Sequence, residues 1–228
     1  MANYAGAKDD RMARSRKPAK PLDATASTDA GRDSELRIIG GQFRGRRLRY
    51  HGDPVVRPMK HRVREAIFNL ISTDSAGRHA IDLFAGTGAL GLEALSRGAA
   101  GATFIERHVP TARVLEENIA ALGVGDRARL LVTSAFLWCK RDLPTAGAGP
   151  PRDRPWLVFC SPPYDFFVQR SNEMLDLLRQ VAQHAPATSV LVVESDQRFD
   201  FRPLIGENYA AWDVREYSPA VVGIGRLP

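Results

Sequence analysis

The chain has 228 residues, of which 44% are hydrophobic, and a formal net charge of +6 at pH 7. This length and composition suit one large domain, or one domain with a small appendage, and exclude a chain too polar to bury a core. No apolar run approaches the roughly 18 residues that span a bilayer, and the N-terminus lacks the apolar segment of a signal peptide, so we expect a cytoplasmic protein without membrane contact.

The two cysteines, Cys139 and Cys160, both lie in apolar stretches of sequence. Buried cysteines of this kind behave as small hydrophobic residues. We therefore expect two reduced core residues rather than a disulfide or a pair of metal ligands, and no metal site.

The positive charge is concentrated in residues 36–69. This segment holds nine Lys and Arg against two acidic residues, a net +7, so the rest of the chain sums to about −1. Arginine dominates, and its guanidinium group binds phosphate in a bidentate manner and stacks on bases. The block favours a polyanionic partner, although a solvated basic face remains the alternative.

Three segments precede the main domain. Residues 1–35 contain few large apolar residues, which predicts a disordered tail. Residues 36–50 predict a small hairpin, because Gly40, Gly41 and Gly45 supply turn positions. A helix is expected from Arg57-Pro58 to about residue 72, so that 36–75 would form an RNA-binding hairpin and helix ahead of a domain over 76–228.

From residue 80 onward, short apolar runs alternate with helical patterns. The expected strands are 80–84, 102–106, 128–133, 156–160 and 189–194, the expected helices are 88–97, 110–122 and 171–184, a loop is expected over 142–155, and 209–225 predicts two antiparallel strands. This order is typical of an α/β protein with a mostly parallel sheet and helices on both faces, a Rossmann-like architecture.

The first of these strands runs into a glycine-rich turn, Ile81-Asp82-Leu83-Phe84-Ala85-Gly86-Thr87-Gly88-Ala89-Leu90-Gly91. Glycines let the backbone approach a ligand closely, and Glu106, at the end of the second strand, could hydrogen-bond the hydroxyls of a ribose. The pattern indicates a cofactor that contains adenosine. For Glu106 the alternative is a solvated carboxylate at a strand end.

Asp82 favours S-adenosylmethionine over a nicotinamide cofactor. It lies just before the turn, where a carboxylate could face the ammonium group of a ligand. The alternative for Asp82 is a helix cap or a hydrogen bond within the loop.

The fourth strand ends abruptly at Ser161-Pro162-Pro163-Tyr164. Proline has no N–H, so its carbonyl can face a cleft as an acceptor, and Tyr164 offers a flat ring. Acceptors beside a stacking ring suit a planar amine. A plain strand-to-loop stop, with Tyr164 and the following Phe166-Phe167 packed in the core, is the alternative; we favour stacking for Tyr164 and lid packing for the two phenylalanines.

At these residues the chain resembles bacterial methyltransferases that modify the exocyclic N2 of a guanine in 16S rRNA, a family of class I S-adenosylmethionine-dependent enzymes. The matching segments are Arg37-Ile38-Ile39-Gly40-Gly41-Gln42-Phe43-Arg44-Gly45-Arg46, Arg57-Pro58, Arg62-Val63-Arg64-Glu65-Ala66-Ile67-Phe68-Asn69, the stretch 82–99, Phe104-Ile105-Glu106 and Pro162-Pro163-Tyr164. The resemblance covers residues 36–228 and implies a seven-stranded sheet.

The resemblance also implies roles for individual residues. The catalytic set is Ser161, Pro162, Pro163 and Tyr164; the S-adenosylmethionine set is Asp82, Phe84, Ala85, Gly86, Thr87, Gly88, Glu106, Arg107, Ser134 and Ala135; the RNA-binding set is Arg37, Arg44, Arg46, Arg57, Arg62, Arg64 and Asn69. The implied partner is 16S rRNA or the small ribosomal subunit, and the implied state is a monomer.

Three positions depart from the family pattern. Ser161 replaces Asp or Asn, Thr133-Ser134-Ala135 offers a hydroxyl where Asp or Asn is usual, and His61 replaces an acidic residue. Serine is a shorter, uncharged acceptor, and losing a charge-assisted bond costs about 1.5–3 kcal/mol. We therefore expect a slower enzyme in which Ser161→Asp raises activity.

Two other functions remain open on the sequence. The serines at 134 and 161 leave the possibility of an RNA-binding or ribosome-assembly protein with weakened or lost catalysis. A nicotinamide oxidoreductase would rest on Gly86, Gly88 and Gly91 alone.

Overall fold

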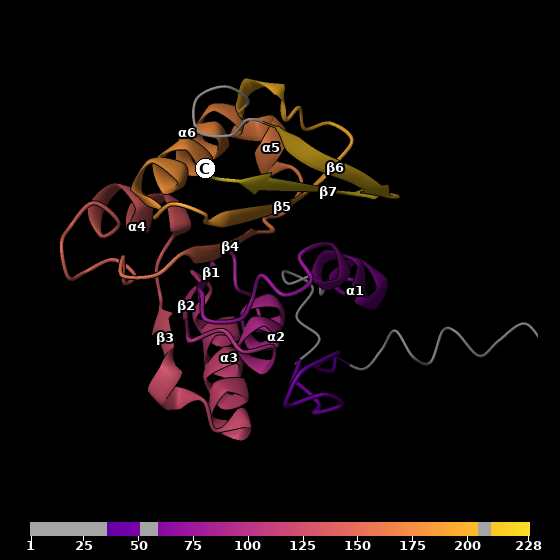
Figure 1. Cartoon of the computed structure of the whole chain (residues 1–228), viewed down its shortest axis with the longest axis vertical. Helices are drawn as coiled ribbons and strands as arrows, with labels where there is room; N and C mark the ends of the chain where they lie inside the picture. The colour runs from indigo at the N-terminus through magenta and orange to yellow at the C-terminus, as the bar shows by residue number, and fades with distance from the viewer. Residues whose placement is uncertain (1–35, 51–58, 205–210) are drawn as a thin grey trace, which may run out of the picture.

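The computed structural model describes residues 36–50, 59–204 and 211–228. A seven-stranded sheet in the order β3-β2-β1-β4-β5-β7-β6 runs through the molecule (Figure 1). The strands are β1 His79–Asp82, β2 Gly101–Ile105, β3 Ala128–Leu131, β4 Trp156–Cys160, β5 Val190–Asp196, β6 Trp212–Tyr217 and β7 Ala220–Arg226. The helices are α1 His61–Leu70, α2 Ala89–Ser96, α3 Val109–Leu122, α4 Ala135–Arg141, α5 Phe166–Gln169 and α6 Ser171–His184, with 3-10 turns at Gly125–Arg127 and Arg202–Leu204.

Strands β1 to β5 pair in parallel, and β7 is antiparallel to both of its neighbours, β5 and β6. The pairs β1–β2, β2–β3 and β4–β5 are joined through helices, as a crossover connection requires, and α4 carries the chain from β3 at the sheet edge to β4 beside β1. The α/β fold with a mostly parallel sheet is therefore confirmed, and so is the antiparallel pair at the C-terminal end.

The core has two layers, one on each face of the sheet. Helices α1, α2 and α3 cover one face and share a cluster with Ala80, Phe159 and Val192 of the strands. Helices α4, α5 and α6 cover the other face with Ile81, Val158 and Val193. Successive residues thus alternate between the faces, as the period of a β-strand demands, and Figure 1 shows the two helix layers on opposite sides of the sheet.

The segment 36–50 forms the predicted turn, held by the Ile38 N–H to the Arg46 carbonyl at 2.9 Å and the Gly45 N–H to the Ile38 carbonyl at 2.9 Å. Its pairing is limited to an isolated bridge between Arg37 and Arg47. Ile38 and Leu48 are buried in the same cluster as α1, α2 and α3. Residues 36–50 therefore share the core of the main body, and we call them the N-terminal hairpin.

Helix α2 holds the N-terminal hairpin through buried polar side chains. The carboxylate of Glu93, fully buried, accepts the N–H groups of Ile39 at 2.6 Å and Gly40 at 2.7 Å. The Ser96 hydroxyl accepts the Phe43 N–H at 3.0 Å. Gly41 has a φ of +76°, and a Cβ there would lie 1.9 Å from the Ser96 carbonyl oxygen. The glycine is thus required by a close approach between two backbones.

Several expected boundaries shift, and two helices were missed. Helices α4 and α5 were not predicted, because helices of seven and four residues are too short to show a clear helical periodicity in the sequence. Residues 142–155 form a loop, as expected. The tail 1–35, Arg57-Pro58 and the start of the segment 209–225 lie outside the described residues.

Cys139 and Cys160 are both buried and neither forms a disulfide, as predicted. Burial raises the pKa of the Cys139 thiol to about 11, and it also raises the pKa of Cys160. Among the residues that the structure describes, none of the helices combines the length and apolarity needed to cross a membrane.

Candidate active site

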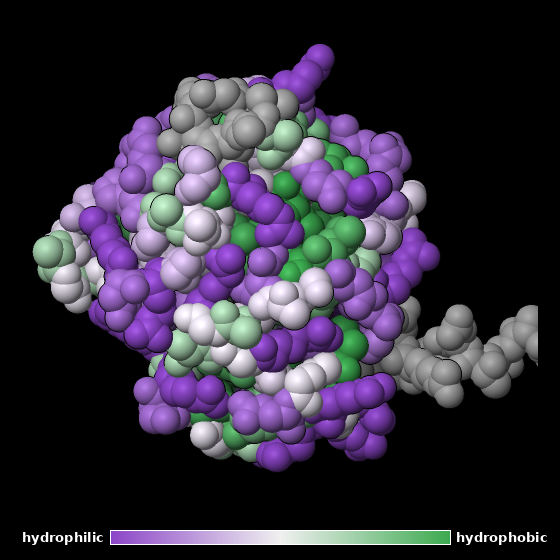
Figure 2. Space-filling view, in the orientation of Figure 1, coloured by the Kyte–Doolittle hydropathy of each residue, from purple (hydrophilic) through white to green (hydrophobic). Residues whose placement is uncertain are grey.

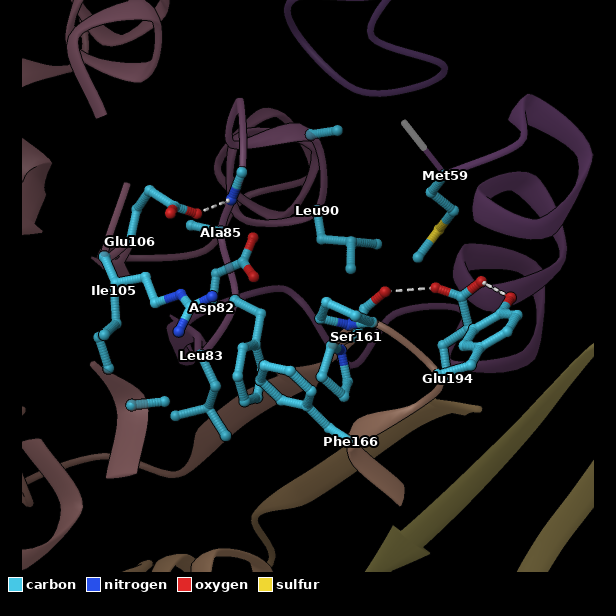
Figure 3. A pocket seen from close by; sticks show the side chains of 18 of the residues that line it. Met59, Asp82, Leu83, Ala85, Leu90, Ile105, Glu106, Ser161, Phe166 and Glu194 are labelled. Atoms are coloured by element: carbon cyan, nitrogen blue, oxygen red, sulfur yellow. Dashed lines mark hydrogen bonds between the residues drawn. The ribbon is translucent and has the colours of Figure 1, made fainter. Parts of the chain in front are cut away.

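A pocket of about 520 Å³ opens at the carboxyl ends of the parallel strands. In doubly wound α/β folds this edge of the sheet is where ligands bind. Asp82 ends β1, Glu106 follows β2, Ser161 follows β4, and Glu194 lies near the end of β5. Figure 3 shows Glu106 and Glu194 on opposite sides of the pocket, with the Asp82 carboxylate between them.

One side of the pocket is formed by α1 and the two C-terminal strands, β6 and β7. Val63 of α1, Tyr217 of β6 and Ala220 of β7 line it. Figure 2 shows apolar surface in the region of β6, β7 and α1, bordered by hydrophilic side chains. An apolar lining with a few placed polar groups is typical of a ligand site.

Asp82 is buried, with 1% of its surface exposed. Its Oδ2 accepts the Gly91 N–H at 3.1 Å, whereas Oδ1 is buried without a hydrogen-bond partner among the described residues. Burial raises the pKa of this carboxyl group to about 7, against the opposing effect of the Gly91 N–H. An unpartnered buried acceptor that faces a pocket fits a cationic group of a ligand.

The glycine-rich turn is held in place by Glu106. Its Oε2 accepts the Gly86 N–H at 2.8 Å, and its Oε1 accepts the His108 N–H at 2.7 Å. Each carboxylate oxygen keeps a second lone pair, so Glu106 can fix the turn and still accept from a ribose hydroxyl. Gly88, at a φ of +87°, leads into α2, and a Cβ there would lie 2.3 Å from Leu115 Cδ1.

An aromatic wall closes another side of the pocket. Phe84, Phe136 and Phe166 lie with ring centroids 6.0–6.2 Å apart. The Arg170 guanidinium lies 3.9 Å from the Phe136 ring centre, and Arg107 lies 5.8 Å from Phe166. Flat apolar rings of this kind suit the face of a purine. The sequence had indicated Phe84, Phe166 and Arg107, but neither Phe136 of α4 nor Arg170, at the turn between α5 and α6, because neither segment gave a motif.

Except for Gly88, whose position packs against Leu115 of α3, the remaining predicted cofactor residues line the same pocket. Ala85, Gly86, Thr87, Ser134 and Ala135 all line it, the last two at the start of α4. Phe167, predicted to share lid packing with Phe166, is instead a core residue: it is 3% exposed and packs 4.3 Å from the Phe199 ring.

The Ser161-Pro162-Pro163-Tyr164 segment meets a carboxylate that the sequence analysis missed. Glu194 accepts hydrogen bonds from the Ser161 hydroxyl and, at 2.7 Å, from the Tyr164 hydroxyl. Glu194 is 6% exposed, and burial raises its pKa, an effect that the two hydroxyl groups partly offset. The Pro163 carbonyl accepts the Phe166 N–H at 2.9 Å and so belongs to the turn into α5.

Strand register explains why these two residues meet. Cys160 of β4 lies beside Val193 of β5, so the next residue of each strand brings Ser161 next to Glu194. Ser161 lies two residues after Phe159, and Glu194 lies two residues after Val192. Side chains two residues apart in a strand are on the same face of the sheet, so both belong to the face that α1 covers. The signal available in the sequence was a lone acid after the apolar run Val190-Leu191-Val192-Val193, and register cannot be deduced from one strand alone.

Of the predicted RNA-binding residues, Arg37, Arg44, Arg46, Arg62 and Asn69 have exposed side chains. Arg62 also donates to the Ser218 carbonyl at 2.9 Å, which ties α1 to the turn between β6 and β7. Arg57 lies outside the described residues.

The prediction for Arg64 is corrected by the structure. Its side chain is 1% exposed and donates to the Arg37 carbonyl at 2.6 Å from beneath the N-terminal hairpin. Burial lowers its pKa, and Glu93 opposes that effect. Arg64 lies three residues before Ile67 and so falls on the buried face of α1. It supports the hairpin and is not available to a partner.

The sheet order, the glycine-rich turn and the acid after β2 define the fold of class I S-adenosylmethionine-dependent methyltransferases. A family model described as "Conserved hypothetical protein 95" matches residues 36–222. The chain belongs to this family, and the predicted resemblance is confirmed.

Named relatives agree with this assignment. The Ribosomal RNA small subunit methyltransferase D of Escherichia coli (strain K12) is 42% identical over 130 residues, which cover 57% of this chain and 61% of that relative. The match thus spans about three fifths of that relative's length. A Bacillus subtilis protein named "Putative rRNA methyltransferase YlbH" is 30% identical over 172 residues, covering 75% of this chain and 89% of the relative.

The solved structure "Putative methyltransferase yhhF from Escherichia coli" has a TM-score of 0.67 and 31% identity to this chain. The superposition covers 85% of this chain and 98% of that one. The described fold is therefore shared along nearly the whole length of a solved relative.

Proposed function

We propose that this protein transfers a methyl group from S-adenosylmethionine to the exocyclic N2 of a guanine in 16S rRNA. The observation that carries the proposal is the pocket itself, in which the unpartnered Asp82 oxygen and the Ser161–Glu194 contact lie within one cavity. The relatives named for small-subunit rRNA methylation support the choice of substrate.

The residues of the pocket fit the cofactor. Asp82 would hold its ammonium group, Glu106 its ribose hydroxyls, and the wall of Phe84, Phe136 and Phe166 its adenine. When bound, S-adenosylmethionine supplies an activated sulfonium methyl group. This chain then has to align the accepting nitrogen and shield the pocket from water, and alignment supplies most of the rate in such a reaction.

The opposite side of the pocket would hold the target base. The amine of guanine is a poor nucleophile because its lone pair is delocalised into the ring. Acceptors at Ser161 and at the Pro162 carbonyl would draw the nitrogen toward a tetrahedral geometry, and Tyr164 would stack on a flipped-out base. The exposed arginines of the N-terminal hairpin would contact the phosphate backbone.

The proposed partner is the 16S rRNA, free or within the small ribosomal subunit, and the proposed working form is a cytoplasmic monomer. The test is incubation of the purified protein with labelled S-adenosylmethionine and small subunits from a strain that lacks the corresponding gene. Label at a guanine N2 supports the proposal. Cofactor binding without transfer to any RNA would instead favour a binding protein that has lost catalysis.

A further inference from the structure

The serine that departs from the family pattern is not an isolated neutral acceptor. Its hydroxyl donates to Glu194, a carboxylate from the neighbouring strand β5, so the Ser161 oxygen keeps its lone pairs for another donor. A hydroxyl that donates to a carboxylate is also polarised, which makes its oxygen a better acceptor.

Building on the proposed function, we propose that Glu194 is a positioning residue that acts through Ser161, so that the two together replace the single Asp or Asn of the family pattern. The carboxylate orients and polarises the Ser161 hydroxyl, and the Ser161 oxygen accepts a hydrogen bond from the target amine. The negative charge that Ser161 lacks is thus supplied by the Glu194 carboxylate on the neighbouring strand, β5.

The surroundings of Glu194 support this role. Its other oxygen accepts the Tyr164 hydroxyl at 2.7 Å, so the carboxylate is held at both ends by residues of the same four-residue segment. Figure 3 shows Ser161 beside Glu194, with Ser161 nearer the centre of the pocket. A carboxylate with 6% of its surface exposed and two hydroxyl donors is a fixed group, because its alternatives in the pocket are few.

The contact also provides a path for the proton that the amine must lose. As the nitrogen lone pair forms the new N–C bond, the C–S bond breaks and its electrons remain on sulfur as a neutral thioether. The proton released by the alkylated nitrogen passes to the Ser161 oxygen, while the hydroxyl proton of Ser161 passes to Glu194. The carboxylic acid so formed returns its proton to water after the product leaves.

The first test is Glu194→Gln, which keeps the size of the side chain and removes the charge. We expect kcat to fall about 10- to 100-fold, with the KM for S-adenosylmethionine and its calorimetric Kd changed less than twofold. Glu116→Gln, at an exposed position on α3, is the matched control and should behave as the wild type. A purely structural role would lower cofactor affinity and thermal stability together with kcat.

The second test uses Ser161→Asp in two backgrounds. In the wild type it brings two carboxylates together and should lower activity, because adjacent like charges force one group to take up a proton. Combined with Glu194→Gln, the same change should restore activity relative to Glu194→Gln alone. Only the proposal predicts that Ser161→Asp lowers activity in the wild type and raises it in the Glu194→Gln background. This prediction replaces the expectation from sequence that Ser161→Asp raises activity.

A Glu194→Gln enzyme with the wild-type kcat, or a Ser161→Asp enzyme more active than the wild type, would overturn the proposal. If Glu194→Gln fails to fold, the Ser161→Asp result decides alone. Failure of the proposed function is distinguishable, because the wild-type protein itself would then methylate no guanine while still binding the cofactor.

Discussion

At the scale of single residues, the pocket is built from acidic side chains that are costly to bury. Asp82 has an oxygen without a partner among the described residues, and its pKa is raised to about 7. Such a group destabilises the ligand-free protein when it is ionised and becomes favourable when a cation arrives. A bound cationic ligand would therefore offset the destabilisation that the buried Asp82 carboxylate causes in the ligand-free protein.

Replacing this group should separate stability from binding. In Asp82→Asn the buried charge is gone, so we expect the ligand-free protein at pH 8 to gain about 1–3 kcal/mol of unfolding free energy. Cofactor affinity measured by calorimetry should fall at least tenfold. A variant that is less stable than the wild type but binds the cofactor normally would contradict the role of Asp82.

The same group predicts a pH dependence. Its folded pKa is raised above that of the unfolded chain, so the folded state gains stability as pH falls from about 7 toward 4. Between pH 8 and pH 5.5 the wild type should gain about 2 kcal/mol relative to Asp82→Asn, measured by urea unfolding. Cofactor affinity has the opposite pH dependence: it should be about tenfold weaker at pH 6 than at pH 8, because the Asp82 carboxyl group must be ionised to hold an ammonium group. A wild type and Asp82→Asn with parallel pH profiles would refute this assignment.

At the scale of elements, the N-terminal hairpin is fixed by polar contacts with α2 and α3. Glu93 receives two hairpin N–H groups and the Arg97 guanidinium at 2.7 Å. Asn118 of α3 accepts the Arg49 N–H at 2.7 Å and donates to the Thr87 carbonyl at 3.0 Å. The hairpin is thereby linked to the same turn that would hold the cofactor.

Glu93→Gln tests this linkage. The change removes the carboxylate that pairs with Arg97 and whose charge stabilises the buried Arg64 cation, so we expect a loss of about 3 kcal/mol in unfolding free energy. Hydrogen exchange at Ile39 and Gly40 should accelerate more than exchange in β4. The exposed Glu116→Gln should stay within about 0.5 kcal/mol of the wild type. Equal effects of the two substitutions would show that Glu93 does not anchor the hairpin.

The elements also show what could be predicted from sequence. Asp82, the glycine-rich turn and Glu106 were found because strand, turn and helix follow one another within a short segment, where local patterns apply. Glu194 and Arg64 were misjudged because their environments depend on tertiary contacts. Glu194 meets Ser161, 33 residues earlier in the chain, only because of the register between β4 and β5. Arg64 is covered by the N-terminal hairpin, which precedes α1 in the sequence and contacts it only in the folded protein.

At the scale of the whole molecule, the basic residues of the N-terminal hairpin and α1 lie next to one wall of the pocket. Leu36 of the hairpin, Lys60 just before α1 and Val63 of α1 line it directly. A polyanion bound by the exposed arginines would therefore be brought to the mouth of the pocket. This arrangement couples binding of the backbone to presentation of a base.

The electrostatic part of this arrangement is measurable. Arg44→Ala, at an exposed hairpin position, should weaken RNA binding and reduce the slope of log K against log salt by about 1. Arg141→Ala on α4, on the other side of the sheet, is the control and should leave the slope unchanged. The RNA-contact assignment would be wrong if both variants gave the same slope.

The most direct test of the whole account is mapping of methylated guanines in 16S rRNA from small subunits treated with the purified protein. We predict N2-methylguanine at one position with the wild type, and strongly reduced yields in equal time with Asp82→Asn and with Glu194→Gln. Subunits that gain no methyl group from a wild-type protein that binds S-adenosylmethionine would contradict the account.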